Sequence, residues 1–330
     1  MVRRNLLSTL IIALLGATIS CDDAFDPHGE FIERPVLYCV MEGNLVGMTS
    51  QSALLGRTVP GKAFSVYSDS LSSPAIRGAA LILRAQGTAY VLAETLMTIW
   101  PGTPQEALQL RYAIRAMWLK PTDNARIEAT LPDGRVLTAS TSVPPYLYFE
   151  QSYRFPHGFT TAVNPITRGS TWAFSWEAPE GLLHFPELTL RYSLQRDDTT
   201  TIERFVRIPR RTVASGEGET PVFPTAAFDR SCDFEYRTID SVFAGLGRGE
   251  GEFLKLVIHS LNFSVTTYDA PLARYYTSSH GSMDPYSIRI DEMVYSNISG
   301  GLGVFGTYVV SRDSYAVDED YIESFGYSAR

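Results

Sequence analysis

Apolar and polar residues alternate with a period of two along most of the chain, and stretches with a helical period are nearly absent. In residues 126–140, two β-rich arms flank Pro132-Asp133-Gly134, where proline presets φ and glycine accepts a positive φ. Residues 80–83 and 89–92 flank Gln86-Gly87-Thr88 in the same manner. Both segments therefore predict β-hairpins, and the chain as a whole is predicted to be all-β.

The first half of the chain also carries a strand with one apolar and one polar face. The apolar face consists of Leu110, Tyr112, Ile114, Ala116 and Trp118, and the opposite face carries Arg111 and Arg115. This alternation is typical of an antiparallel sheet with one buried face and one face in water. Together with the hairpins, it predicts an immunoglobulin-like β-sandwich over residues 35–145 that is closed by Pro144-Pro145.

A second β-rich unit is predicted over residues 146–330. Trp172, Phe174 and Trp176 share one face of a strand that ends at Ala178-Pro179, and a strand that contains Tyr192 follows at residues 188–194. This order is similar to that of a fibronectin type III β-sandwich. Residues 254–263 form a dense apolar run, which predicts a central strand of this unit.

One short helix is predicted to be inserted in the second unit. Asp269 occupies the position of an N-cap residue, and Pro271 suits the first helical turn. The packing face would consist of Leu272, Tyr275 and Tyr276, and Gly281 would end the helix. Residues 210–221, in contrast, contain Ser215-Gly216-Glu217-Gly218 and predict a mobile loop.

The N-terminus has the features of an export signal. Arg3 and Arg4 precede a twelve-residue apolar run, whereas a transmembrane helix needs about 20 apolar residues. Residues 1–20 are therefore predicted to be a signal peptide, and residues 21–34 a tether. The exit Thr18-Ile19-Ser20-Cys21 resembles a bacterial lipobox, in which Cys21 is lipidated and becomes the mature N-terminus; the same small residues also suit ordinary signal-peptide cleavage.

Lipidation at Cys21 would attach the protein to a membrane without spanning it. We therefore expect it in the cell envelope, on the outer membrane, facing the periplasm or the surface. Asp22 and Asp23 fit both inner-membrane retention and surface export, so the side of the membrane stays open.

Two cysteines remain after Cys21. An exported protein resides where disulfides persist, so Cys39 and Cys232 are a candidate disulfide. The alternative is two buried free thiols, since Cys39 lies in the apolar run Val36-Leu37-Tyr38-Cys39-Val40.

Charge and motifs exclude several function classes. The net charge of -8 argues against nucleic-acid binding, which needs a cationic face. The sequence contains neither CxxC nor HExxH, and we expect no metal site and no cofactor. The segment with Ser278, His280 and Asp284 contains the residue types of a hydrolase triad but lacks the GxSxG elbow. We therefore predict no catalytic residues and keep a hydrolase as an alternative.

Three other features allow a functional and a plain interpretation. Asp318-Glu319-Asp320 could hold Ca²⁺ but is more typical of a solvated acidic tail. The glycines of residues 245–251 precede a strand, which is the wrong order for a phosphate cradle and favours a loop. The tryptophans could form a sugar-stacking platform, but at strand spacing they are more typical of a core.

A family resemblance emerges near the C-terminus. The segment Asp284-Pro285-Tyr286 leads into Ser296-Asn297-Ile298-Ser299-Gly300-Gly301-Leu302-Gly303-Val304-Phe305-Gly306. This pattern resembles the lipoproteins that contain domain of unknown function 4249, and the resemblance extends over about residues 21–310. Residues 78–83 and the pair Asp133-Gly134 with Val143-Pro144 agree with it. The resemblance implies an exported, envelope-attached β-protein considered alongside TonB-dependent receptors, and it implies no catalytic residues.

The same residues have a plain physical interpretation. Gly300, Gly301, Gly303 and Gly306 allow a positive φ or a close backbone approach, and Val304 to Val310 would form a strand after this turn. A turn with a final core strand is one interpretation, and a partner-docking loop is the other. On the functional level we predict a lipid-anchored binding or accessory module, with an outer-membrane receptor as candidate partner. The alternatives are a structural or adhesive surface lipoprotein and a secreted hydrolase.

Overall fold

The computed structural model describes residues 32–58, 75–99, 102–103, 106–151, 171–216, 218–278 and 295–329. Residues 34–330 form one compact unit. Most of the described residues lie in strands, and three short helices are found among them. The prediction of an all-β fold is therefore confirmed. The predicted signal peptide, Cys21 and most of the tether lie outside the described residues.

The largest sheet has twelve strands. Its order is β11-β10-β15-β16-β1-β2-β5-β4-β3-β6-β7, with β17 beside β15. Seven of its strands come from the first predicted unit: β1 (Pro35–Gly43), β2 (Thr49–Arg57), β3 (Ala80–Ala85), β4 (Thr88–Ile99), β5 (Ala107–Met117), β6 (Asn124–Thr130) and β7 (Val136–Ser142). The others come from the second: β10 (Leu183–Gln195), β11 (Thr201–Arg207), β15 (Lys255–Tyr268), β16 (Leu302–Tyr315) and β17 (Ser328–Ala329).

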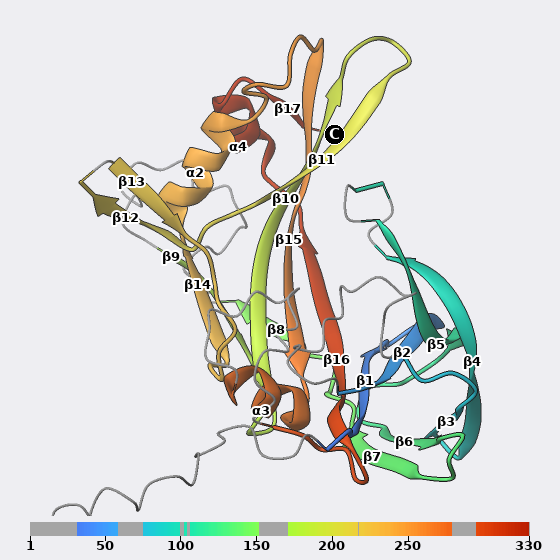
Figure 1. Ribbon diagram of the computed structural model, residues 1–330. Helices are drawn as coiled ribbons and strands as arrows, with labels where there is room; N and C mark the ends of the chain where they lie inside the picture. Colours follow the sequence, from blue (N-terminus) through green and yellow to red (C-terminus); the bar gives the residue numbers. More distant parts are fainter. Residues whose placement is uncertain are drawn as a thin grey trace, which may run out of the picture. The chain divides into compact units, whose positions relative to one another are not determined.

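Strands β1 and β16 come from opposite ends of the chain and run side by side in parallel (Figure 1). Val36 lies opposite Leu302, and Gly43 lies opposite Val309. β1 is buried along most of its length, and β16 is mostly buried over the part that pairs with β1, which is the usual environment of parallel strands. The sheet is thus continuous across the predicted boundary at residues 145 and 146, and the two predicted units share it.

Each predicted unit nevertheless has its own hydrophobic core. The first core gathers residues of β1 to β7, together with Phe305 and Val309 of β16. The second core is aromatic and lies between the large sheet and a three-stranded sheet made of β8 (Phe149–Gln151), β9 (Thr171–Trp176) and β14 (Ser231–Glu235). There Phe174 stacks on Phe263 with ring centroids 3.9 Å apart. Sheets that face each other across such a core form a β-sandwich.

Three helices pack on the sheets, two of them in the second core and one in a third hydrophobic cluster that combines residues of β1 and β2 with residues of β10 and β15. They are α2 (Tyr236–Gly245), α3 (Ala270–Ser278) and α4 (Glu319–Ser324). The predicted helix corresponds to α3, because the Leu272 amide donates to Asp269 Oδ1 at 2.9 Å, as an N-cap requires. Leu272, Tyr275 and Tyr276 are buried as expected, and Gly281 lies outside the described residues. Helices α2 and α4 were not predicted.

Both predicted hairpins are confirmed. Gln86 and Gly87 have φ values of 54° and 74° and form the turn between β3 and β4. Two successive positive φ values are typical of the type I′ turn, which matches the twist of the flanking strands. Gly134, with a φ of 85°, completes the turn between β6 and β7. These turns depend on local backbone conformation, so the sequence alone sufficed to predict them.

Two strand predictions need correction. Residues 210–221 do not form a loop, because β12 (Arg211–Ser215) and β13 (Gly218–Val222) pair as an antiparallel hairpin. Their mostly exposed side chains lack an apolar face that would have revealed strands. In β5, Ala116 is exposed and Met117 is buried, although Ala116 was assigned to the apolar face. The pairing of β2 with β5 shifts between Thr49 and Gln51, and such an irregularity moves the following side chains to the other face.

The candidate disulfide also needs correction. Cys39 and Cys232 are both free and buried. Cys39 lies on β1 in the core of the first unit, whereas Cys232 lies on β14 in the aromatic core of the second. Since the two thiols belong to separate cores, the alternative of two buried thiols holds. Burial raises the pKa of Cys232 to about 12.

Candidate functional site

Residues 296–306, which carry the family resemblance, are held to β16 by the side chain of Asn297. Asn297 Nδ2 donates to the carbonyl of Phe305 at 2.7 Å, and the amide of Phe305 donates to Asn297 Oδ1 at 2.9 Å. The side-chain amide of Asn297 thereby takes the place of a neighbouring strand at this point of β16. The Ser296 hydroxyl accepts from the amide of Ile298 at 3.3 Å, and Ile298 is buried in the first core.

The glycines of the segment lie where a side chain would collide with backbone. A Cβ atom on Gly303 would come within 2.0 Å of the Leu37 carbonyl oxygen, and Gly303 has a φ of +117°. A Cβ atom on Gly301 would come within 2.7 Å of the Pro35 carbonyl oxygen. Real Cβ atoms do not approach other atoms so closely, so these glycines allow the chain to pass against β1.

The segment also covers an edge of the sheet. Ser299 and Thr138 exchange two backbone hydrogen bonds, of 2.8 and 3.1 Å, on the side of β7 that faces away from β6. A Cβ atom on Gly300 would lie 2.5 Å from the Val136 carbonyl oxygen of the same strand. An uncovered sheet edge invites pairing with other chains. The described motif residues therefore act as a structural edge cover, while Asp284 and Pro285 lie outside the described residues.

A buried carboxylate joins this segment to both units. Asp269 is 1% exposed, and its Oδ2 accepts from the Thr141 hydroxyl at 2.5 Å and from the Thr307 amide at 2.6 Å. The Thr307 hydroxyl donates to the same oxygen at 3.0 Å. Thr141 belongs to β7 and Thr307 to β16, so one side chain connects two distant strands to the start of α3. A Cβ atom on Gly306 would lie 2.9 Å from Asp269 Oδ1, which explains the glycine there.

The buried environment of Asp269 changes the pKa of its carboxyl group. Burial raises the pKa of Asp269 to about 6, while the hydrogen bonds from Thr141, Leu272 and Thr307 act in the opposite direction. A carboxyl group with such a pKa could exchange protons near neutrality. Its oxygens are occupied by donors from its own chain, and its side chain is almost fully buried, so Asp269 is a structural link. Sequence analysis identified it only as a helix cap.

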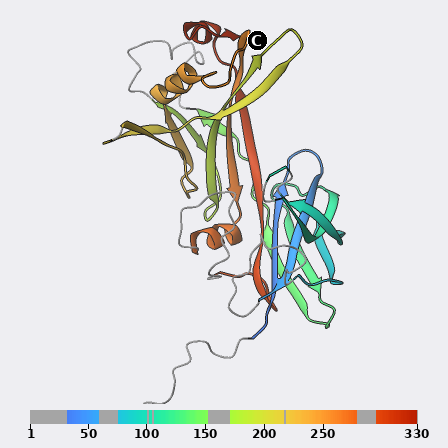
Figure 2. The ribbon, with the colours of Figure 1, turned by 45° about the horizontal axis from the view of Figure 1, so that its top comes forward.

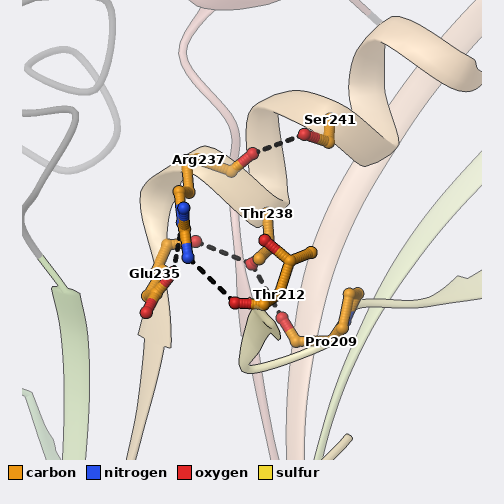
Figure 3. Close-up of polar contacts among 6 residues, drawn as sticks. All are labelled: Pro209, Thr212, Glu235, Arg237, Thr238 and Ser241. Carbon is orange, nitrogen blue, oxygen red and sulfur yellow. Dashed lines mark hydrogen bonds and ion pairs between the residues drawn. The ribbon is translucent and has the colours of Figure 1, made fainter. Parts of the chain in front are cut away.

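A second polar cluster surrounds the start of α2 (Figure 3). The Thr238 hydroxyl lies 2.7 Å from the carbonyl oxygens of both Pro209 and Glu235. Arg237 forms an ion pair with Glu235 and donates to the Thr212 carbonyl at 3.0 Å. The hydroxyl groups of Thr238 and Ser241 donate to backbone carbonyls and not to a base, which is the arrangement of a structural link and not of a nucleophile.

The other residues considered for chemistry are dispersed or occupied. Among the residues that the structure describes, no three His, Cys, Asp or Glu side chains are grouped so that they could hold a metal ion. His259 Nε2 lies 2.9 Å from the Ser193 hydroxyl on the neighbouring strand. Asp318 accepts from the Tyr321 amide and caps α4, so it belongs to a helix start and not to a loose tail. His280 and Asp284 lie outside the described residues, and the tryptophans of β9 are buried in the core.

The turn between β1 and β2 exposes apolar side chains. Val46 is 78% exposed and Met48 is 68% exposed, and Leu45 is also exposed. We call Leu45, Val46 and Met48 the apolar turn. Gly47 has a φ of +99° and open space around it. Sequence analysis did not identify this site, although its signal was present: three large apolar residues around a glycine between two strands.

The base of the apolar turn is fixed by its neighbours. The amide of Asn44 donates to the Leu119 carbonyl at 2.8 Å, and Trp118 Nε1 donates to the Asn44 carbonyl at 2.9 Å. Lys120 Nζ lies 4.2 Å from the centroid of the Trp118 ring, a cation–π distance. The apolar turn is therefore an exposed tip on a base that these two hydrogen bonds hold.

Comparison with known proteins assigns neither a family nor a function to the chain. No family model matches the chain, and no curated protein matches it. The resemblance to the domain of unknown function 4249 lipoproteins therefore stays a prediction that rests on the motif residues. In the described part of the chain, no helix has the length and apolar character needed to cross a membrane.

Proposed function

We propose that this protein is a lipid-anchored binding module of the cell envelope and serves as an accessory to an outer-membrane receptor of the TonB-dependent class. The apolar turn carries the proposal on the structural side. The lipobox-like sequence at Cys21 and the motif resemblance support the location and the class of partner.

The apolar turn is suited to contact with another protein. Large apolar side chains that are clustered and exposed often mark interaction sites, whereas single exposed ones need no explanation. Leu45, Val46 and Met48 are adjacent in the chain, and the hydrogen bonds of Asn44 to Leu119 and Trp118 hold their base. A turn whose base is already fixed loses less conformational entropy on binding than a free segment would.

The strength of this contact can be bounded from the exposed side chains. Full burial of a valine side chain contributes about 1.5–3 kcal/mol. Loss of the Val46 contact should therefore weaken binding by a factor on the order of 10 to 100. Val46→Asp should leave the fold intact, because the side chain is 78% exposed.

The test is purification of the tagged full chain from solubilised envelopes, with identification of the co-purifying proteins by mass spectrometry. We expect a TonB-dependent receptor to accompany the wild-type chain and Val91→Asp but not Val46→Asp. Val91 is a matched control, since it is 67% exposed on β4, away from the apolar turn. Failure to recover a receptor with the wild-type chain would favour the structural or adhesive alternative. Equal recovery with both variants would exclude the apolar turn as the contact.

A further inference from the structure

Two arginines of β5 lie on the same face of the large sheet, Arg111 and Arg115. Tyr112 belongs to the first core and Ile114 packs against it. Since side chains alternate between the two faces of a strand, Arg111 and Arg115 lie on the opposite, outer face. Strand β5 runs between β2 and β4, and Figures 1 and 2 show these three strands side by side.

The guanidinium group of Arg111 is half-buried and is held by two neutral acceptors. Its Nε donates to Gln109 Oε1 at 2.8 Å, and its Nη1 donates to Ser52 Oγ at 3.2 Å. A guanidinium group has five N–H groups, and these two bonds use only two of them. The other N–H groups can donate to a further acceptor.

The positive charge of Arg111 is not compensated. Among the residues that the structure describes, no carboxylate forms an ion pair with Arg111 or with Arg115. Burial lowers the pKa of Arg111, and no acidic side chain acts against this effect. By contrast, Glu250 raises the pKa of Arg204. Arginine stays protonated in proteins, and a charge withdrawn from water is normally paired, so the site lacks an anion.

The surface between the two arginines is made of small side chains. Ala113 lies between them on β5, and it pairs with Ser52 of β2 on one side and with Ala93 of β4 on the other. All three side chains are at least partly exposed. The Ser52 hydroxyl accepts from Arg111 and keeps its own hydrogen to donate. A ligand that lies above Ala113 would therefore meet donors from three residues.

We propose that Arg111, Arg115 and the Ser52 hydroxyl bind a phosphate group above Ala113. The planar fork of an arginine matches two phosphate oxygens. Arg111 and Arg115 are four residues apart on a strand, about 13 Å between Cα atoms, so their long side chains can lean toward Ala113 from both sides. Two positive charges favour a dianion over a singly charged carboxylate. A soluble phosphate compound and a lipid headgroup share this chemistry.

The first test is a titration with inorganic phosphate at pH 8 and constant ionic strength, followed by ³¹P NMR. The protein is the full-length chain with Cys21→Ser, which carries no lipid. We expect saturable binding that Arg111→Gln and Arg115→Gln each weaken by about 10- to 100-fold, because each removes hydrogen bonds to a charged group. Arg126→Gln is the matched control, since Arg126 is exposed on β6 beside Glu128, and it should leave binding unchanged.

The second test separates a phosphate site from general attraction between charges. Arg111→Lys keeps the charge but lacks the fork, so it should bind phosphate more weakly than the wild type does. Phosphate should also raise the melting temperature of the wild type above its value in chloride at equal ionic strength. Melting of each variant without phosphate shows whether the fold is retained. Arg115 is exposed, so Arg115→Gln should fold as the wild type does.

Vesicles of phosphatidylglycerol distinguish the two sources of the phosphate group. Co-sedimentation of the wild type and Arg126→Gln, but not of Arg115→Gln, would identify a lipid headgroup as the ligand. Binding of inorganic phosphate without such a difference would identify a soluble phosphate compound.

Equal effects of phosphate and chloride on the wild type would overturn the proposal. Phosphate binding that Arg111→Gln and Arg115→Gln leave unchanged, or that Arg126→Gln weakens equally, would overturn it as well. None of these results depends on the apolar turn, so they are independent of the proposed accessory function.

Discussion

The buried carboxyl group of Asp269 should make the folded chain less stable at pH 7 than at pH 5. Burial raises its pKa to about 6, whereas an aspartate in an unfolded chain has a pKa of about 3.9. Between these values the folded chain holds a proton that the unfolded chain has released. Stability therefore rises as the pH falls through this window. Above about pH 6, both states are ionised and the contribution of Asp269 is constant.

The magnitude follows from the shift. A difference of about two pKa units corresponds to roughly 3 kcal/mol between pH 7 and pH 4. The side chain is 1% exposed, so solvent screening does not reduce this figure much. On protonation, the hydroxyl of Thr141 or Thr307 can rotate from donating to accepting, so the network can adapt to the added proton.

His184 should oppose this effect in the same pH range. Its ring is buried on β10, with Nδ1 at 3.2 Å from the Thr267 hydroxyl. Burial, with a further contribution from Arg230, lowers the pKa of His184 to about 4. Between about pH 6.5 and pH 4 the unfolded chain therefore binds a proton that the folded chain does not. His184 thus reduces stability as the pH falls, and the wild-type profile is the sum of two opposite slopes.

Because the contributions of Asp269 and His184 oppose each other, the pH profile of the wild type alone does not separate them, and variants must be compared. We would measure the free energy of unfolding in urea from pH 4 to pH 8 for the wild type, Asp269→Asn and His184→Gln. Asp269→Asn should be less stable at all pH values by about 1–3 kcal/mol, because its NH₂ group replaces one carboxylate oxygen, so that either the Leu272 amide or the Thr307 amide loses its acceptor. Relative to the wild type, Asp269→Asn should lose stability as the pH falls from about 6 to about 4, because only the His184 slope remains, and His184→Gln should gain stability over the same range. Parallel profiles for the wild type and Asp269→Asn would refute the reasoning.

Three further outcomes are expected. Gly303→Ala should prevent folding or lower stability by several kcal/mol in urea unfolding, since its Cβ would lie 2.0 Å from the Leu37 carbonyl oxygen; near-wild-type stability would contradict this close approach. Cys39 and Cys232 should resist a thiol reagent until the chain is denatured, because burial raises the pKa of both thiols, and rapid labelling of the native chain would be the contrary result. Cys21→Ser should move the protein from the membrane to the soluble fraction, whereas unchanged fractionation would argue against lipidation.

The sequence showed which residues of the candidate sites are unusual, but it did not show what they contact. The glycine-rich segment was visible in the sequence, but the reason for Gly303 is the Leu37 carbonyl, which is 266 positions away along the chain. Leu45, Val46 and Met48 of the apolar turn were also visible in the sequence. The same residue types occur in buried turns and in exposed turns, however, so the sequence did not show that these side chains are exposed. Only the surroundings of a side chain decide whether water or protein covers it.

By itself, the sequence determined what depends on neighbours along the chain. The turn at Gln86-Gly87, the cap of α3 at Asp269 and the buried face of β9 were all predicted, because a turn, a cap and an alternating face need only a few consecutive residues. Only the tertiary structure decided the parallel pairing of β1 with β16, the links made by Asp269 and the position of β11 at one end of the large sheet. Each of these joins segments far apart in the chain, and the choice among the many combinations that such segments allow depends on the packing of the whole molecule.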